Sequence, residues 1–345
     1  MKKLLLSVIM LSFLVATIGV IVVEGASRPR ILILHSYETD YAWTRTVNQG
    51  IDRAKRAHMN VDIRYHYMNT KNQSSEAAKK RAATVAKRVV DNYQPNVLLV
   101  IDDDAQRLVA TDYIGNEAIQ IVFAGVNAEL EAYGYQDADN VTGILERKSV
   151  SAIKEVLRLL VESQPRLGSL KGSVVYLSDS STSAKLDAGY LARQEWAPLE
   201  YQGHLGVKTF EQWKQAVLSL NGKYQFLLVG GYRKLFSDGS ESFASAEEVA
   251  QWTEANSTLP IVGINAFNSE DGVMLSIGAS PFEQGEIAFE RAIRLVEDPA
   301  SLSQMPVAIS KQYVVALRHQ ALEARDIKVP KVLEAFARAT NNYFE

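Results

Sequence analysis

Residues 96–127 read NVLLVIDDDAQRLVATDYIGNEAIQIVFAGVN, and this stretch decides the fold. Two apolar runs, 97–101 and 119–124, flank a segment of helical composition. Both runs are apolar on both faces, which is typical of buried strands in a parallel sheet. Each run ends in a polar or glycine tip, at 102–104 and at 125–127. Because ligands bind outside the carboxyl ends of such strands, both tips are expected to face one crevice.

The alternation of strand and helix continues on both sides of this stretch. A first series of strands is predicted over 31–36, 61–68, 97–101 and 119–124, with helices between them. A second series begins at residue 173 and continues over 201–207, 224–229 and 259–264. Repeated β-α units with right-handed crossovers predict an α/β protein of two Rossmann-like lobes with parallel sheets.

The composition limits the class of protein. The chain has 345 residues, of which 47% are hydrophobic and 22% charged, as in ordered globular proteins. A formal net charge of −3 predicts no general attraction to nucleic acid or anionic membranes. The chain has no cysteine. Disulfides, thiolate metal sites, cysteine nucleophiles and a lipid-modified cysteine are therefore excluded.

The amino terminus has the pattern of an export signal. Lys2 and Lys3 precede an apolar stretch over 4–23, and small residues follow it. This pattern predicts a signal peptide over 1–25, cleaved after Gly25 or Ala26. The alternative is an uncleaved anchor, since twenty apolar residues also span a bilayer. Without a cysteine to carry a lipid tether, cleavage predicts a free protein of a Gram-negative periplasm.

Six motifs, in order, resemble one family of binding proteins. They are ILILHSYETDYAWTRTVNQGI (31–51), PNVLLVIDDDAQ (95–106), IQIVFAGVNAEL (119–130), NVTGIL (140–145), SIGASPFEQGEIAFERAIRLVEDP (276–299) and ALRHQALEARDIKVPKVLEAFA (316–337). The sequence resembles the substrate-binding proteins of ABC transporters that include tryptophan- and tyrosine-type binders. These are type 1 periplasmic binding proteins.

The resemblance implies two lobes joined by a hinge of three crossovers. Lobe one is then expected at 27–146 plus 276–303, and lobe two at 147–275 plus 304–345. Closure of such lobes traps a small molecule. The resemblance implies a monomer that delivers its ligand to an ABC permease, without a cofactor. Because the strand tips hold no arginine of the kind used by sugar-binding relatives, an amino acid or aromatic ligand is favoured.

Two other functions remain open. HSYETDYAW (35–43) and VFAGVN (122–127) also resemble extracytoplasmic sensor domains of histidine kinases and diguanylate cyclases. The chain would then be a periplasmic sensing subunit that signals through a separate membrane enzyme. An enzyme of periplasmic-binding fold is the third reading. Against it, the sequence has none of the motifs G-x-S-x-G, H-E-x-x-H, G-x-G-x-x-G or the P-loop.

The first loop supplies the aromatic candidates for ligand contact. Ser36, Tyr37, Tyr41 and Trp43 follow the first strand, and aromatic rings there stack on planar or apolar ligands. The alternative for Trp43 is a staple that packs the first helix. In the next tip, Asp103 is expected to face the ligand by family position, although carboxylates at a helix start also serve as caps.

The remaining candidates lie at later strand tips. Hydroxyls at a helix start bind carboxylate or phosphate, but they also cap helices without any ligand. The candidates expected from this chemistry or from family position are Ser181, Thr182, Asn127, Tyr232, Asn265, Phe267 and Ser280. The histidines lack metal-ligand spacing, and no metal site is expected. Only His35 stands at a strand end, where a hydrogen-bonded histidine is a simpler reading than a pH switch.

Overall fold

The computed structural model describes residues 28–56, 60–164, 167–168, 172–240 and 242–345, together with positions 10, 14 and 17. Apart from those three positions, the expected signal segment 1–25 lies outside the described residues. Within the described part, no helix is long and apolar enough to cross a membrane. The chain divides into two compact units, Met1–Ile144 with Gln284–Val307 and Leu145–Glu283 with Ala308–Glu345.

The first unit is built on a six-stranded sheet in the order β11-β5-β4-β3-β1-β2. The strands of the first unit are β1 (Arg30–His35), β2 (Asp62–Tyr67), β3 (Val97–Ile101), β4 (Gln120–Val126) and β5 (Val141–Leu145). The sheet also includes β11 (Ala308–Ile309), which directly follows the end of this unit at Val307. β1 pairs in parallel with β2 and β3, and β3 pairs in parallel with β4. The tips of β1, β3 and β4 therefore lie side by side, and β2 lies at the edge that its alternating sequence predicts.

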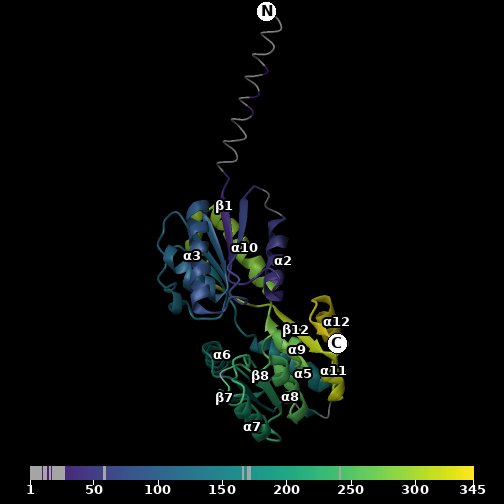
Figure 1. Cartoon of the computed structure of the whole chain (residues 1–345). Coiled ribbons are helices and arrows are strands. Elements are labelled where there is room, and N and C mark those ends of the chain that lie inside the picture. The colour runs from purple at the N-terminus through teal and green to yellow at the C-terminus, as the bar shows by residue number, and fades with distance from the viewer. Residues whose placement is uncertain are drawn as a thin grey trace, which may run out of the picture. The chain divides into compact units, whose positions relative to one another are not determined.

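Helices cover both faces of this sheet. They are α2 (Ala42–Lys55), α3 (Glu76–Tyr93), the short α4 (Asp103–Leu108) and α10 (Pro281–Glu297), with the 3-10 turns η1 (Ala110–Tyr113), η2 (Leu130–Tyr133) and η4 (Pro299–Gln304). Leu34 and Val100 pack with Val90 of α3 on one face. α3 lies on one side of the sheet, and α2 and α10 lie on the other (Figure 1). Strand side chains alternate between the two faces, so both layers bury apolar surface.

α10 joins the first unit from far along the chain. A Cβ at Gly285 would stand 2.0 Å from the carbonyl oxygen of Val47, so only glycine lets α10 come this close to α2. Nε of Arg53 lies 3.1 Å from Oε1 of Glu286 beside this contact. The return of the chain to the first unit through α10 therefore has a specific packing basis.

The second unit contains a seven-stranded sheet in the order β13-β12-β10-β9-β8-β6-β7. Its strands are β6 (Ser173–Asp179), β7 (Glu200–Val207), β8 (Phe226–Val229), β9 (Ile261–Gly263), β10 (Leu275–Ala279), β12 (Tyr313–Arg318) and β13 (Tyr343–Phe344). β10 and β12 pair antiparallel, whereas the other pairs described are parallel. The antiparallel pair departs from the wholly parallel sheet that the sequence predicts.

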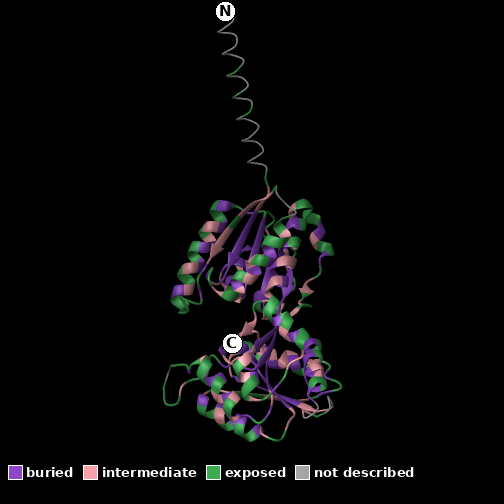
Figure 2. Cartoon of the chain, turned by 90° about the vertical axis from the view of Figure 1, so that its right-hand side faces the viewer, coloured by how far each residue is buried: buried purple, intermediate pink, exposed green. Residues whose placement is uncertain are grey.

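Two apolar layers cover this second sheet. Its helices are α5 (Val150–Ser163), α6 (Thr182–Ala192), α7 (Phe210–Leu220), α8 (Ala246–Asn256), α9 (Phe267–Asp271), α11 (His319–Ala324) and α12 (Lys331–Ala339). Tyr176 and Leu228 pack with α5 on one face, while Leu177 and Val229 pack with Trp213 of α7 on the other. Buried residues concentrate in the strands and on the inward sides of the helices (Figure 2).

The unit boundaries differ from the expected ones. Residues 276–279 were expected in lobe one, but they belong to β10, which pairs with β9 and β12 in the second unit. The chain returns to the first unit at Gln284, within α10, and leaves it again at Ala308. The reason is that the run Leu275–Ala279 is fully buried as a strand, so it needs sheet partners on both sides.

Candidate functional site

Ser36 ties the first strand tip of the first unit to the second. Its hydroxyl donates to the Ile101 carbonyl at 2.9 Å and accepts from the Ala105 N–H at 2.8 Å. The side chain is fully buried. Ser36 thus holds the tips of β1 and β3 together, and the structure gives it an internal role at the expected site.

Asp102 sits at the tip of β3 in a strained conformation. Its φ of 71° and ψ of 160° lie in a region that residues other than glycine rarely adopt. Such strain costs about 1–3 kcal/mol and is concentrated at ligand clamps and active sites. The neighbouring Gly125, with φ of 65°, leaves room for the Asp102 carboxylate. The sequence singled out the tip but gave no sign of this backbone strain.

Asp103 serves as a hydrogen-bond acceptor for the tip of β4. Its Oδ1 accepts from the Tyr133 hydroxyl at 2.5 Å and from the N–H groups of Asn127 and Ala128 at 3.3 Å. Burial, and then the Asp103 carboxylate, raise the pKa of Tyr133. The structure thus brings Asp103 and Asn127 together, but through bonds within the unit. Ligand contact by either remains a prediction.

The rings of Tyr37 and Tyr41 in the first loop form what is called here the aromatic corner. The Tyr37 and Tyr41 rings meet edge to face, with centroids 5.4 Å apart and planes at 80°. Both side chains are half-buried. Burial, and then the carboxylates of Asp102 and Asp103, raise the pKa of Tyr37 well above its ordinary value. The corner is thus a neutral aromatic surface in a negative field.

Trp43 lies in the first turn of α2, half-buried. Its indole Nε1 is buried and has no hydrogen-bond partner within the described residues. Buried indole N–H groups usually have a partner, so this one is an unused donor. Both readings of Trp43, as ligand contact and as helix staple, remain predictions.

His35 is buried at the end of β1. Its Nε2 lies 2.9 Å from Oδ1 of Asn48, and its ring stacks on Tyr67 with centroids 4.9 Å apart. Burial lowers the pKa of His35 to about 4, although the Asn48 hydrogen bond opposes this shift. The imidazole is therefore neutral near pH 7, in line with the simpler of the two readings.

In the second unit, the tip of β6 serves as a helix cap. The Ser181 hydroxyl accepts from the Ala184 N–H at 3.3 Å and starts α6, while Thr182 is exposed on the first turn. Asp179 accepts from the Ser181 N–H at 2.9 Å and from the Lys234 N–H at 3.2 Å. Ser181 and Thr182 therefore lie at an accessible helix start, where the capping alternative also applies.

Tyr232 belongs to the core. It is 1% exposed, and its hydroxyl donates to Asp271 at 3.0 Å. The ring meets Trp213 edge to face with centroids 5.7 Å apart. This burial argues against the expected ligand contact, because the side chain points into the layer beneath α7.

An arginine does stand beside this tip, contrary to the sequence argument for the ligand. Two N–H groups of Arg233 donate to the Asp271 carboxylate, at 3.1 and 2.5 Å. Its guanidinium lies 4.3 Å from the centroid of the Phe267 ring. Because Arg233 directly follows the tip of β8, the absence of arginine from the tips is a weaker reason to favour an amino acid or aromatic ligand. Phe267 is half-buried beneath the guanidinium.

Asn265 is hydrogen-bonded to Lys148, a buried lysine that was not among the residues predicted from the sequence. Lys148 Nζ donates to Oδ1 of Asn265 at 2.7 Å and lies 3.5 Å from Glu146 and 3.8 Å from Asp187. The Lys148 side chain is 4% exposed. Burial alone would lower the pKa of Lys148, but Asp187 and Glu146 outweigh it and raise the pKa. Nothing in the local sequence ERKS distinguished this lysine from a solvated one.

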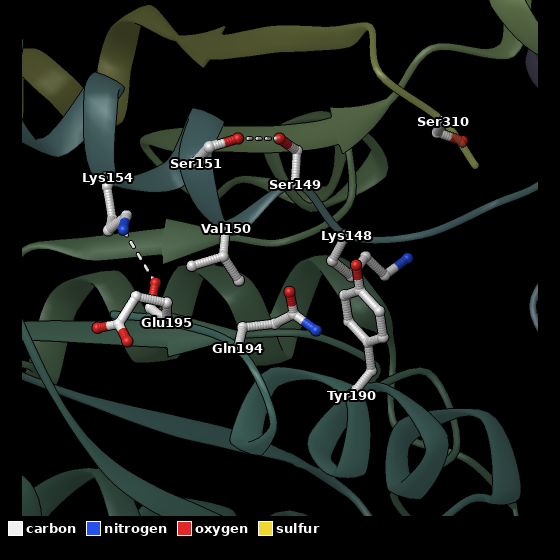
Figure 3. Close-up of a pocket in the computed structure, with 9 residues that line it drawn as sticks. All are labelled: Lys148, Ser149, Val150, Ser151, Lys154, Tyr190, Gln194, Glu195 and Ser310. Atoms are coloured by element: carbon white, nitrogen blue, oxygen red, sulfur yellow. Dashed lines mark hydrogen bonds between the residues drawn. The ribbon is translucent and has the colours of Figure 1, made fainter. Parts of the chain in front are cut away.

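A hollow of about 330 Å³ opens beside Lys148 at the start of α5 (Figure 3). Its lining combines hydroxyl, amide and charged groups from α5, from the end of α6 and from residue 310. Lys154 donates to the Glu195 carbonyl at 2.9 Å across one side. Tyr190 of α6 and Gln194, just after that helix, form the opposite wall.

Ser280 caps α10. Its hydroxyl accepts from the Glu283 N–H at 3.2 Å, and its own N–H donates to the Gln312 carbonyl at 3.2 Å. The side chain is buried. Ser280 thus resembles Ser36, a strand-tip hydroxyl used within its own unit. Within the described ranges, no group of three or more acidic or histidine side chains is placed to hold a metal ion.

Comparison with known proteins is informative at the level of structure. No protein-family model matches the sequence, and no curated protein matches it. Solved structures do match. A ligand-free, open substrate-binding protein with adhesive properties from Clostridium difficile has a TM-score of 0.63 at 18% identity. That match covers 88% of this chain and 96% of the other.

Two further structures extend this result to proteins with different ligands. An ABC domain in complex with L-Trp from Streptococcus pneumonia has a TM-score of 0.57 at 14% identity, covering 90% of this chain and 98% of the other. The arabinose-binding protein AraP from Geobacillus stearothermophilus has a TM-score of 0.54 at 11% identity, covering 90% and 99%. The chain therefore has the substrate-binding-protein fold, two α/β lobes with largely parallel sheets, as its six motifs predicted.

Proposed function

We propose that this chain is an extracytoplasmic solute-binding protein that captures a small molecule and delivers it to an ABC permease. The observation that carries the proposal is the fold similarity across the whole chain. It includes both units and spans 96% of a substrate-binding protein. A fold alone does not specify a function. The polar and aromatic side chains at the strand tips add chemical support in each unit.

In this proposal, the aromatic corner of the first unit and accessible tips of the second supply the groups that contact the ligand. Tyr37, Tyr41 and Trp43 would supply ring surface, and Thr182 and Asn265 would supply polar groups. An amino acid or aromatic compound is the favoured ligand. That preference rests mainly on the rings, because Arg233 stands directly after the tip of β8.

Export to a Gram-negative periplasm is part of the proposal. It rests on Lys2, Lys3 and the apolar stretch that follows them. Fractionation of cells that express the full chain tests it. The mature protein should start near Ala26 or Ser27 and appear in osmotic-shock fluid. Intact Met1 in the membrane fraction would contradict it.

Ligand identification tests the central claim. Native mass spectrometry of protein purified without refolding should reveal a bound small molecule. Calorimetric titration with that compound should give one site per chain. Crosslinking in cells that express the chain should then capture a permease. Capture of a histidine kinase or diguanylate cyclase would replace transport by the sensing function, and absence of binding to any amino acid, aromatic or sugar pool would overturn both.

A further inference from the structure

We infer that the free edge of the first sheet binds an extended, acidic protein segment, which adds a strand beside β2. The inference goes beyond the proposed function, because it concerns a protein partner and not the captured solute. The parts that carry it are β2, a hollow beside this strand and the arginines of α3. All of them belong to the first unit.

β2 is hydrogen-bonded to a strand on one side only. It stands last in the strand order of its sheet and pairs in parallel with β1. The N–H groups of Asp62 and Met68 donate toward β1, each at 2.9 Å. Because the bonding direction alternates along a strand, Ile63, Tyr65 and Tyr67 turn their N–H and C=O groups to the other side. No other strand of the described residues pairs there, so the edge can accept one more strand.

A hollow of about 270 Å³ lies between this strand and α3. β2 contributes His66 and Tyr67 to its lining, and α3 contributes Arg81, Ala82 and Val85. Since the side chains of alternate residues stand on the same face of a sheet, one row of side chains of an added strand would stand on the face of the hollow. Val85 is 50% exposed and offers apolar surface to that row.

The arginines of α3 determine which charge the partner should carry. Arg81, Val85 and Arg88 are three or four residues apart, so they form one exposed stripe on the helix. Lys79 and Lys87 of the same helix are in ion pairs, whereas no acidic side chain of the described chain pairs with the two arginines. Carboxylates on an added strand would neutralise these arginines, and a basic strand would be repelled.

The residues of β2 leave this face positive. Arg64 is exposed, and its guanidinium lies 4.3 Å from the centroid of the Tyr93 ring of α3. Burial lowers the pKa of His66, so its imidazole is neutral near pH 7. Asp62 is the acidic residue of β2. Together with the two arginines of α3, three cations therefore stand against one carboxylate.

Amide hydrogen exchange measures whether a strand is added. The probe is a blocked heptapeptide of alternating glutamate and valine, and the control is a heptapeptide of alternating lysine and valine. NMR of the intact protein should show that the acidic peptide slows exchange at Ile63, Tyr65 and Tyr67. The N–H groups of Arg64 and His66 already face β1 and should change little. The lysine peptide should leave all five groups unchanged.

Variants separate the edge from the charge. Tyr65→Pro removes one outward N–H at an edge position, where proline is tolerated, and should weaken binding of the acidic peptide by about tenfold or more. Tyr65→Ala keeps the N–H and should keep most of the affinity. Arg81→Gln and Arg88→Gln should each weaken binding by about two- to fivefold. Lys80→Gln, at an exposed position of the same helix, should have a smaller effect than either.

Several outcomes would overturn the inference. They are no binding of the acidic peptide, equal binding of both peptides, and binding without slower exchange at the outward N–H groups. Wild-type affinity in the protein with both Arg81→Gln and Arg88→Gln would also overturn it. Slow exchange in the protein alone, lost on dilution, would mean that a second copy occupies the edge instead. The exchange measurement on the wild-type protein decides the matter even if Tyr65→Pro does not fold.

Discussion

Gly125 leaves space that the Asp102 carboxylate occupies. A Cβ placed at Gly125 would stand 2.8 Å from Oδ1 of Asp102. Both residues have positive φ, 65° and 71°, at the adjacent tips of β3 and β4. The conformations of the two tips therefore depend on each other. The β4 tip needs a residue without a side chain, and the β3 tip carries a strained aspartate.

Replacement of Gly125 by alanine should lower the free energy of unfolding for two reasons. The positive φ costs an alanine about 1–2 kcal/mol, and the contact with Asp102 adds about 1–3 kcal/mol. Gly115→Ala is the control, because Gly115 also has a positive φ, of 72°, but no atom lies within 4 Å of a Cβ placed there. Urea unfolding of both variants should show the larger loss for Gly125→Ala; equal losses would mean that the carboxylate simply moves aside.

The Asp103–Tyr133 bond should contribute to stability. Asp103→Ala removes a charged acceptor from the Tyr133 hydroxyl and from two backbone N–H groups, so we expect a loss of about 1.5–3 kcal/mol. Tyr133→Phe should cost less. In a double-mutant cycle, the two changes should couple by at least about 0.5 kcal/mol. Additive losses would show that the short bond contributes nothing of its own.

Trp43 tests the aromatic part of the proposed site. If its ring touches the ligand, Trp43→Ala should weaken binding by roughly ten- to a thousandfold, from lost burial and ring contact. Trp43→Phe should keep most of the affinity. Calorimetric titration and a melting curve on each variant measure the two effects. Unchanged affinity with a large loss of stability would identify Trp43 as the staple of α2.

The sequence predicted the sheets well because buried parallel strands have a plain signature. The run 97–101 coincides with β3, and the alternation of 61–68 correctly marked β2 as an edge strand. β12 was not predicted. Its residues Tyr313–Arg318 are as apolar as the other buried strands, but they directly precede the helical segment of α11, and short apolar runs do not separate the two states.

The candidate site was predicted less completely, because sequence gives the position of a residue but not its hydrogen bonds. Ser36 and Ser280 do lie at strand tips, yet both hydroxyls are used within the protein. Tyr232 follows a glycine tip but turns into the core. Lys148 was missed because its partners Asn265 and Asp187 are distant in sequence and come together only in the fold.

His35 should make the free energy of unfolding depend on pH. Its pKa of about 4 in the folded protein lies below the ordinary value of 6.5, so the unfolded chain binds the proton more tightly. The contribution is therefore fully present above pH 6.5 and is lost as pH falls toward 4, by about 3 kcal/mol in total. His35→Gln should flatten the unfolding free energy over this window; a slope like that of the wild type would locate the effect elsewhere.

Removal of the Lys148 charge should destabilise the second unit strongly. Lys148→Met leaves Asp187 and Glu146 without their buried cation, so we expect a loss of about 3–5 kcal/mol at pH 7. Burial raises the pKa of Asp187 even though Lys148 opposes this, so protonation at lower pH should shrink the deficit. Lys154→Met, which loses only bonds to carbonyls, is the control. A deficit that does not change with pH would contradict the charge argument.

α10 lies late in the sequence but packs in the first unit, and this order has a consequence for biosynthesis. The Gly125 N–H donates to Oε1 of Gln284 at 2.8 Å, and Gly285 fits against the backbone of α2. During translation, the sheet residues up to β5 emerge long before these partners. The first lobe therefore stays incomplete until most of the second has been made. Such delayed closure keeps the first lobe of the nascent chain open while the second lobe is being synthesised.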